Sequence, residues 1–504
     1  MFKSEIRDSV IDFLLEKASK RNFGKYLSKI FLNKVRGLEN QVITFDFPVT
    51  AIISTNGGGK TTILGSAAII YRSIQPKKFF ARGGNFDNDM QNWQIQYEII
   101  DKDINARDIV RRTANFRQFK WNRDPLSRHV LDFGVSRTVP PIEKNDFNRY
   151  ANSKVVFPGD STYTIDTIIA ENVGRILGKD ISNFKYLKFS SSGQIEFLAG
   201  TNEKGVQYSE FHFGAGESSI IRMITQIESL PENSLVLIEE IENGLHPVAT
   251  IKMVEYLIDV ADRKKIQTIF TTHSNDALKP LPPKAIWASI NGKLFQGKLD
   301  IHSLRTISGQ IDTKLAIFVE DKFAKLWIES ILRSLDSVAL DNIQIHSLSG
   351  DGNAVNVHKY HNIDPTVSKK FPSVCFLDGD SQQKENSKDF IFRLPGQSPE
   401  SFIYTSVQEK LDEYKVILSV ALQKKPEFAD KLVELINDIK ITNRDPHTLF
   451  SQLGIKIGLI PEEIVMMAFL NVWNQAYSQE SYAVLKQILH LTPMEESIEL
   501  NVVS

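Results

Sequence analysis

The sequence of 504 residues predicts an α/β protein with a helical C-terminal region. Three observations carry this prediction. Short β-branched or apolar runs, such as residues 50–54 and 235–238, end in glycines or acids and lead into stretches with helical spacing. Strand and helix patterns alternate between residues 314 and 380, which is typical of a parallel sheet. Beyond residue 405, apolar residues recur every three or four positions, as in amphipathic helices.

Composition and charge are those of an ordinary globular protein, with 42% hydrophobic and 24% charged residues. The formal net charge is −1, so the whole molecule attracts no polyanion and any nucleic-acid surface must be local. The single cysteine, Cys375, excludes an internal disulfide framework and fits a reducing compartment. No apolar run approaches the ~18 residues of a membrane span, and the N-terminus mixes charges where a signal peptide would be apolar. We therefore expect a soluble, cytoplasmic protein without membrane contact.

Domain boundaries are expected at two places. The first is a linker around residues 290–312, and the second lies near residues 400–405. Three glycine-containing turns punctuate the linker, at Asn291-Gly292, Gly297 and Ser308-Gly309. The predicted parts are therefore residues 1–310, 311–404 and 405–504. The helical part could cover the preceding sheet, pair with a second protomer or dock a partner.

A glycine loop follows the first buried strand, where residues 50–62 read TAIISTNGGGKTT. Backbone N–H groups of such a loop can surround phosphate oxygens, while Lys60 neutralises the β/γ charge and the Thr61 hydroxyl holds Mg²⁺. Compared with the pattern G-x-x-x-x-G-K-[ST], Ser54 replaces the first glycine. A glycine turn before a helix is the alternative. The candidate nucleotide-binding residues here are Asn56, Gly57, Gly58, Gly59, Lys60, Thr61 and Thr62.

Two acids end the candidate strand at residues 234–240, SLVLIEE. We expect Glu239 to hold the metal through water and Glu240 to orient the attacking water. Asp is usual at the first position, so the longer Glu239 could change the metal geometry and slow turnover. A further strand begins at Thr268 and ends at His273, which could reach the γ-phosphate. Structural roles at the strand ends are the alternatives.

These elements resemble those of ABC-type ATPases of the SMC/RecF-like and OLD (overcoming lysogenization defect) group. The run Glu242–Pro247, ENGLHP, is similar to the D-loop of that group, and His273 is similar to its switch histidine. The resemblance covers roughly residues 25–310. It implies that ATP and Mg²⁺ are bound and that ATP is hydrolysed.

The signature motif of such ATPases is matched by residues 213–218, FGAGES, at the start of a helical stretch. Gly214 stands where the motif usually has serine, and a plain glycine helix start is the alternative. The resemblance implies a homodimer in which Gly214, Gly216 and Glu217 of one protomer close over the nucleotide of the other.

Acids and a glycine turn end three strands of the predicted parallel sheet. Glu320 ends one strand, Gly350 lies in the turn after the next, and Asp378 and Asp380 end the third. Because the carboxyl ends of parallel strands share one edge, the three acids should converge. Close carboxylates repel unless divalent cations lie among them, and oxygen ligands suit Mg²⁺ or Mn²⁺. The pattern therefore predicts a metal site able to hydrolyse a phosphodiester, and a plain turn after a strand is the alternative.

The order of glutamate, glycine turn and Asp-x-Asp resembles the Toprim (topoisomerase–primase) fold. Together with the ATPase, the chain resembles the OLD-family nucleases, whose further acid is matched by Glu400. The first motif of the family commonly reads V-E-G-x-x-E, but Asp321 replaces the glycine and Ala324 the second acid. Asp321 or Asp351 could complete a metal site instead.

The resemblance implies a metal-dependent DNA endonuclease that is gated by ATP and acts in phage defence. A reverse transcriptase or a helicase could be its partner in a multi-component system. The alternative is a non-nucleolytic DNA-binding or scaffold ATPase with a degenerate Toprim part, because the second acid of the first motif is missing.

Cations interleave with aromatic rings between Arg107 and Arg123. Phosphate contacts and stacking rings are what a nucleic-acid track needs. A solvated β-hairpin with Phe116, Phe119 and Trp121 packed inward explains the same pattern. Both interpretations hold together if only the outward residues contact DNA.

Overall fold

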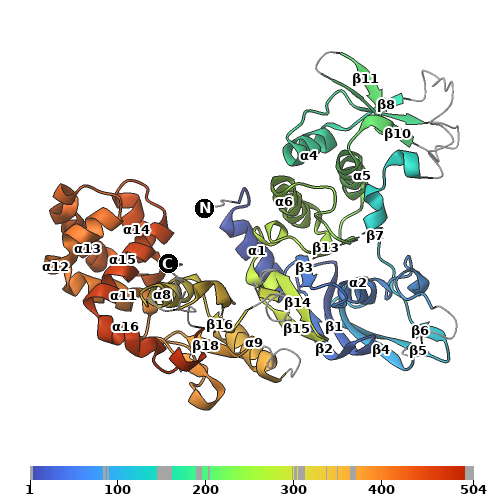
Figure 1. Cartoon of the computed structure of the whole chain (residues 1–504). Helices are drawn as coiled ribbons and strands as arrows, with labels where there is room; N and C mark the ends of the chain where they lie inside the picture. The colour runs from blue at the N-terminus through green and yellow to red at the C-terminus, as the bar shows by residue number, and fades with distance from the viewer. Residues whose placement is uncertain are drawn as a thin grey trace, which may run out of the picture. The chain divides into compact units, whose positions relative to one another are not determined.

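The computed structural model describes residues 4–82, 87, 90–144, 162–188, 196–202, 205–297, 299, 303–304, 313–335, 338–348, 350–363 and 371–493. The chain divides into two compact units, Phe2–Ile301 and His302–Ser504, which run from blue to yellow and from yellow to red in Figure 1. We call them the N-terminal unit and the C-terminal unit and describe each by itself. Both combine sheets with helices, which confirms the predicted α/β class.

A six-stranded sheet forms the centre of the N-terminal unit, in the order β15-β14-β3-β13-β12-β7. Its inner strands are parallel and consist of buried residues, as expected where helices cover both faces. The strands are β3 (Val49–Ser54), β7 (Val130–Phe133), β12 (Leu235–Ile238), β13 (Gln267–Thr272), β14 (Ile286–Ile290) and β15 (Lys293–Gln296). The α-helices among its described residues are α1 (Asp8–Ser19), α2 (Lys60–Ala68), α4 (Thr167–Leu177), α5 (Ala215–Ser229) and α6 (Pro247–Lys264).

Two antiparallel sheets complete the N-terminal unit. The first contains β2 (Leu38–Thr44), β1 (Lys25–Val35), β4 (Trp93–Asp101), β5 (Val110–Arg117) and β6 (Lys120–Arg123) in that order. The second contains β11 (Gln207–Ser209), β10 (Glu196–Thr201), β9 (Lys185–Lys188) and β8 (Thr162–Thr164). One hydrophobic core joins the five-stranded sheet, α2 and the central sheet, with Ile30, Trp93, Ile63 and Leu237 among its buried members.

The hairpin expected between Arg107 and Arg123 forms from β5 and β6. The Phe116 ring is buried and Trp121 is half-buried against it, whereas Phe119 at the turn is 63% exposed. The expectation of rings packed inward is therefore right for two of the three and wrong for Phe119. A two-residue turn places Gln118 and Phe119 beyond the last paired residues, so their side chains are not directed by the sheet.

The linker predicted from residue 290 begins too early. Asn291 and Gly292 form the two-residue turn of the hairpin β14–β15, with φ angles of 45° and 81°. An Asn-Gly pair suits such a turn because both positions need positive φ. The sequence signal was a hairpin turn within the N-terminal unit rather than a boundary. Ser308-Gly309 lies outside the described residues.

A four-stranded parallel sheet begins the C-terminal unit, in the order β17-β16-β18-β19. The strands are β16 (Leu315–Val319), β17 (Ile343–Ser347), β18 (Ser373–Leu377) and β19 (Ile391–Arg393). Helix α8 (Lys322–Arg333) connects β16 to β17, and α9 (Asp351–Ile363) lies between β17 and β18 in the chain. The predicted alternation of strands and helices is therefore confirmed.

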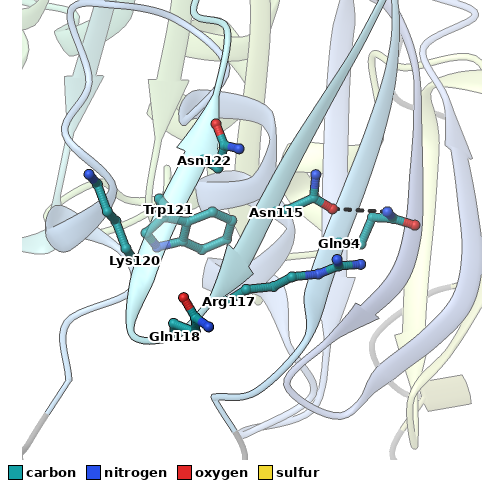
Figure 2. A pocket seen from close by; sticks show the side chains of 7 residues that line it. All are labelled: Gln94, Asn115, Arg117, Gln118, Lys120, Trp121 and Asn122. Atoms are coloured by element: carbon teal, nitrogen blue, oxygen red, sulfur yellow. Dashed lines mark hydrogen bonds between the residues drawn. The ribbon is translucent and has the colours of Figure 1, made fainter.

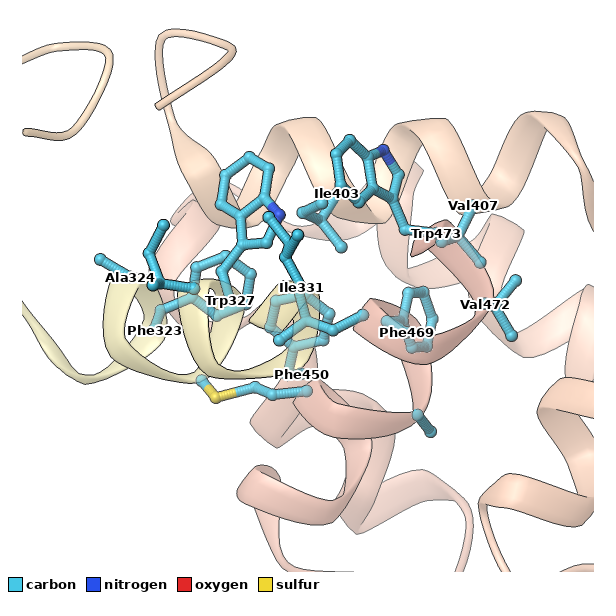
Figure 3. Close-up of a cluster of buried hydrophobic side chains, with 14 of the residues drawn as sticks. Phe323, Ala324, Trp327, Ile331, Ile403, Val407, Phe450, Phe469, Val472 and Trp473 are labelled. Carbon is cyan, nitrogen blue, oxygen red and sulfur yellow. The ribbon is translucent and has the colours of Figure 1, made fainter. Parts of the chain in front are cut away.

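Six helices follow the sheet, and they share a hydrophobic core with it. They are α11 (Pro399–Glu409), α12 (Leu411–Ala421), α13 (Ala429–Thr442), α14 (Leu449–Lys456), α15 (Glu462–Ala476) and α16 (Ser478–Leu485). Trp327 of α8 packs edge-on against Trp473 of α15, and Phe323 stacks on Phe450 of α14 (Figure 3). The helical part therefore covers the sheet of its own chain, which is the first of the three roles considered for it.

Helix α11 crosses the boundary expected near residues 400–405. Its residues Ile403, Tyr404 and Val407 belong to the same core as β16 and β18, so the chain has no break at this point. In the part of the chain that the structure describes, no helix combines the length and the apolar character needed to cross a membrane.

Candidate functional site

The glycine loop connects β3 to α2 at the carboxyl end of the central parallel strands. Gly57 and Gly59 have φ angles of 77° and 89°, a region in which other residues are strained. The loop borders a pocket of about 840 Å³, and all seven predicted loop residues line it together with Glu240 and His273. The structure therefore brings residues from three separate strand ends to one concave site.

Lys60 folds back over the loop, where its Nζ lies 3.2 Å from both the carbonyl oxygen and the hydroxyl of Ser54. The serine that replaces the usual first glycine thus contacts the lysine directly. Burial lowers the pKa of Lys60, while the carboxylates of Glu240 and Glu242 act in the opposite direction. A phosphate entering the pocket would offer the ammonium group a stronger partner than these neutral oxygens.

A second cation at the pocket, Arg36, was not found by sequence reasoning. It occupies the turn between β1 and β2 with a φ angle of 50°, and its guanidinium donates to the Thr62 hydroxyl at 3.3 Å. Asn291, from the hairpin turn described above, also lines the pocket. Neither residue carries a local motif, because its place at the pocket depends on how the two sheets pack.

The two acids after β12 face different spaces. Glu240 lines the large pocket, whereas Glu239 lines a neighbouring one of about 360 Å³. Thr61 lines both pockets and thus shares one of them with Glu239. Glu240 has a φ angle of 46°, which is costly for a residue with a side chain and persists only where the surroundings enforce it.

The Thr271 hydroxyl accepts the Glu240 backbone N–H at 2.9 Å, and the same stretch of backbone is held by Arg137. It lies in a 3₁₀ turn, Val135–Thr138, and its guanidinium donates to the carbonyl oxygens of Glu239 and Glu240, both at 2.5 Å. Burial lowers the pKa of Arg137, and the surrounding carboxylates oppose this, that of Glu242 most strongly. The contact spans about a hundred residues of sequence, so no local signal could have predicted it.

The loop after the two acids is tied to the end of β13. Glu242 accepts hydrogen bonds from the Thr272 hydroxyl and the His273 backbone N–H, both at 2.6 Å. The acid that begins the D-loop-like run thereby sets the position of the histidine at the pocket. This contact was also absent from the sequence-based expectations.

The signature-like residues lie at the start of α5, with Gly214 as its N-cap. Gly216 packs against Gly244 of the D-loop-like run so closely that a methyl group on Gly216 would overlap the Gly244 carbonyl. Glu217 forms an ion pair with Lys179, with 2.7 Å between Glu217 Oε1 and Lys179 Nζ. None of the three predicted signature residues is among those lining the pocket of the glycine loop in the same chain.

Glu320 and Asp378 meet at the edge of the parallel sheet in the C-terminal unit. They directly follow the neighbouring strands β16 and β18, and the Asp378 backbone N–H donates to Glu320 Oε1 at 2.8 Å. Asp378 Oδ1 is buried and has no hydrogen-bond partner among the described residues. Burial raises the pKa of Asp378 to about 8, assisted by the carboxylates of Asp321, Glu320, Glu400 and Asp380.

A close backbone contact explains why glycine, Gly379, stands between the two aspartates. A methyl group on Gly379 would overlap the carbonyl oxygen of Gly396, because the chain before α11 passes directly over this turn. Asp380 is exposed at the mouth of the site. The D-G-D sequence thus combines one sheltered carboxylate, one exposed carboxylate and a tight backbone contact between them.

Glu400 and the two substitute acids have definite partners. Glu400 is only 4% exposed at the first turn of α11, and its Oε1 lies 2.8 Å from His447 Nδ1, which raises the pKa of that histidine. Asp321 caps α8 by accepting the N–H of Ala324 at 2.8 Å. Asp351 accepts the Ser381 hydroxyl at 2.8 Å. His447 was missed from sequence because it lies 47 residues beyond its partner.

The donor chemistry at this edge fits a hard divalent cation, since carboxylates surround a buried oxygen with no described partner. In their present positions, however, no three or more His, Cys, Asp or Glu side chains of the described residues are arranged to hold an ion. Binding would therefore require at least a rotamer change, for example of the exposed Asp380.

Residues 96–278 match the family model described as "AAA domain, putative AbiEii toxin, Type IV TA system". The matched stretch contains the signature-like residues, both acids after β12 and His273, and it begins after the glycine loop. The matched stretch lies within the N-terminal unit. The match does not extend to residues 302–504, and no curated protein matches the chain.

Three solved structures are similar in fold to part of the chain. The SMC head domain from Thermotoga maritima is 13% identical, with 54% of this chain and 97% of that chain covered and a TM-score of 0.33. The Smc head domain bound to the C-terminal domain of ScpA, derived from Pyrococcus furiosus, is 11% identical, with 57% and 99% covered and a TM-score of 0.37. The recombination mediator protein RecF with ATP is 12% identical, with 54% and 99% covered and a TM-score of 0.33. Such distant likenesses carry no argument about activity.

Proposed function

We propose that the protein is an ATP-hydrolysing enzyme of the ABC (SMC/RecF-like) type whose C-terminal unit cleaves DNA with the help of divalent metal ions. The proposal places both activities in one chain and assigns ATP the role of a gate. We further propose that it works in the cytoplasm, as a homodimer, in defence against phage. The observation that carries the nuclease part is the sheltered Asp378 carboxylate beside Glu320 at the edge of a parallel sheet.

In the N-terminal unit, the loop residues Asn56–Thr62 would cradle the phosphates of ATP, with Lys60 and Arg36 as cations. Thr61 and Glu239, which border the same small pocket, would hold Mg²⁺. Glu240 would orient the attacking water, in a position maintained by Arg137. His273 would contact the γ-phosphate from the end of β13, the parallel neighbour of β3.

The proposed dimer is supported by the placement of the signature-like residues. Gly214, Gly216 and Glu217 do not line the nucleotide pocket of their own chain. Gly216 packs instead against Gly244 of the D-loop-like run, as it would if both elements faced a second protomer. Binding of ATP would then stabilise the closed dimer, which is a shift between states rather than a motor stroke.

In the C-terminal unit, Glu320, Asp378 and Asp380 would hold the metal. A divalent cation supplies an activated water and stabilises the leaving oxygen of a phosphodiester. Asp378 contributes the carboxylate oxygen that has no described protein partner, and Glu320 orients the turn by accepting the Asp378 N–H. Glu400, oriented by His447, would face the same site from α11.

The alternative is an ATPase that binds DNA or acts as a scaffold without cutting it. It is favoured by the absence of a ready metal-holding group among the described residues and by Ala324 at the second acid position. Nuclease assays across Mg²⁺, Mn²⁺ and Co²⁺ separate the two. The alternative predicts that ATP is hydrolysed and DNA remains intact under every metal.

The direct test is the variant Asp378→Ala in the full chain. We expect it to abolish DNA cleavage and to leave ATP hydrolysis unchanged, because Asp378 belongs to the C-terminal unit alone. Glu385→Ala is a matched control, since Glu385 is an exposed acid on the loop that follows Asp380. Cleavage by Asp378→Ala at the wild-type rate would remove the nuclease assignment.

A further inference from the structure

A row of carboxamide side chains crosses the outer face of the five-stranded sheet near the β5–β6 turn. Gln94, Asn115 and Asn122 occupy directly paired positions on β4, β5 and β6. Gln94 Nε2 donates to Asn115 Oδ1 at 2.9 Å (Figure 2). Asn33 of β1 donates in turn to Gln94 Oε1. Asn33 thus orients the Gln94 amide, and Gln94 orients that of Asn115. The Asn115 amide lies at the position paired with Asn122.

This row lines a pocket of about 530 Å³. Figure 2 shows Lys120 and Asn122 on one side, Asn115 and Arg117 on the other, and the Trp121 ring between them. The ring packs inward against Phe116 and Phe80, with centroids 5.3 and 5.5 Å away. Because side chains alternate along a strand, Lys120 and Asn122 are directed to the other face of the sheet, where the amides and cations gather.

The cations of this sheet fall into two kinds. Arg111 pairs with Glu98 at 3.3 Å, Arg112 pairs with Asp124 at 3.0 Å, and Arg123 donates to backbone carbonyls. Arg117 and Lys120, which line the pocket, are exposed and form no ion pair with any described residue. The three other cations of β5 and β6 are therefore occupied, and Arg117 and Lys120 are left available where the amides gather.

The turn between these two cations adds an exposed ring. Phe119 has a φ angle of 63°, and Gln118 one of 50°. Arg82 lies over the exposed Phe119 ring, 3.8 Å from its centroid. Positive φ at a phenylalanine is costly, and an exposed ring gains little hydrophobic stabilisation in return. Its cation–π contact with Arg82 holds the ring in place at the turn.

We propose that this pocket binds an unpaired base of a single-stranded nucleic acid. A carboxamide offers a donor and an acceptor side by side, as a base edge requires. Arg117 and Lys120 flank the pocket where the adjoining phosphates would lie, and the exposed Phe119 ring provides a stacking surface for a neighbouring base. A duplex cannot use the pocket in this way, because its bases are already stacked and paired.

The inference deepens the proposed function by naming its substrate class, and it depends on that function only for the claim that the bound strand is also the strand cut. An acidic peptide is the competing occupant, since it too would be attracted by the two cations. It has no use for a stacking surface or for paired amides, and so the nucleic acid is favoured.

The test is fluorescence anisotropy of labelled 20-nucleotide strands with the full chain in EDTA, where cleavage is excluded. We expect single strands to bind at least about tenfold more tightly than the same sequence as a duplex. Arg117→Glu with Lys120→Glu should weaken all single strands and reduce the slope of log K against log salt by about 2. Lys102→Glu with Arg107→Glu reverses the same number of exposed charges at the far end of the sheet and should change little.

Asn122→Leu tests the base contact separately, because Asn122 is exposed and the Gln94–Asn115 hydrogen bond does not involve it. We expect the variant to bind different homopolymer strands equally while keeping the salt slope. If the wild type prefers one homopolymer and the ratio of affinities falls by about tenfold in Asn122→Leu, contact between Asn122 and a base is supported. Unchanged discrimination in Asn122→Leu would overturn it.

Equal affinity for single strands and duplex, or no loss in the charge-reversed variant, would also overturn the proposal. Displacement of the strand by poly-glutamate at equal charge concentration would instead indicate the acidic peptide. Binding is measured without metal, so it can persist when the nuclease assignment fails. Conversely, DNA cleavage that is indifferent to the hairpin variants would refute this pocket alone.

Discussion

Replacing Asp378 by asparagine should stabilise the metal-free C-terminal unit at alkaline pH. The pKa of this carboxyl group is raised from its ordinary 3.8 to about 8 in the folded protein, chiefly by burial. The folded state therefore binds the proton more tightly than the unfolded state does. Stability contributed by the protonated group is complete below about pH 4 and is lost as the pH rises to about 8.

The magnitude follows from the shift. Each pKa unit corresponds to about 1.4 kcal/mol. Because the carboxyl group is only partly buried, we count about half of the rise, which gives about 3 kcal/mol at pH 8. Asparagine has nearly the same shape and no charge, so it should recover that amount at pH 8 and almost none at pH 4. For a unit of this size the gain corresponds to about 6–12 °C in Tm.

Cys375 provides an assay confined to the C-terminal unit. It is the only cysteine of the chain and is completely buried in β18, directly before the acidic turn. A thiol reagent should label it only when this unit opens, so the temperature of half-labelling reports the transition. We expect Asp378→Asn to raise that temperature at pH 8, and Mg²⁺ or Mn²⁺ to raise it in the wild type but not in the variant.

The exposed Glu385 supplies the control, and Glu385→Gln should leave the labelling temperature unchanged at either pH. An equal gain for Asp378→Asn at pH 5 and pH 8 would point to packing rather than to charge. The absence of any gain at pH 8 would show that Asp378 is not a sheltered carboxylate and would refute the reasoning from its burial.

Three further predictions concern the two units. Arg137→Gln should lower kcat for ATP hydrolysis by roughly 30-fold with little change in nucleotide affinity, because about 2 kcal/mol of orientation at the neighbouring acids is lost; a changed KM with normal kcat would contradict this. Gly379→Ala should abolish DNA cleavage because its methyl group overlaps Gly396, whereas Gly352→Ala meets no atom nearer than 3.9 Å and should remain active. Lys60→Ala should remove ATP hydrolysis and make DNA cleavage independent of ATP concentration. If cleavage by the wild type is also independent of ATP concentration, ATP does not gate the nuclease.

The glycine loop and the acid-terminated strands could be predicted from sequence because their signals are local. Lys60 follows three glycines and precedes a helical stretch, and the structure places a strand, loop and helix in that order. The alternation between residues 314 and 380 similarly predicted the parallel sheet. From that sheet, the meeting of Glu320 and Asp378 follows by geometry, since neighbouring parallel strands end at the same edge.

Local signals also misled where one residue pair suits two structures. Asn291-Gly292 was interpreted as the beginning of a linker, although the same pair forms the turn of a hairpin. The helical spacing beyond residue 405 was interpreted as a separate region. Its apolar stripe packs on α8 instead, and spacing alone does not say which surface a stripe will meet.

Sequence by itself determined the strands, the glycine loop and the acids at the strand ends, because these depend on the conformational preferences of consecutive residues. The tertiary structure alone decided that Arg137 supports Glu240, that His447 pairs with Glu400 and that Arg117 and Lys120 form no ion pair with a described residue. Such contacts join residues tens to hundreds of positions apart. They form only when many weak packing interactions select one arrangement of the elements, and no short stretch of the chain encodes that choice.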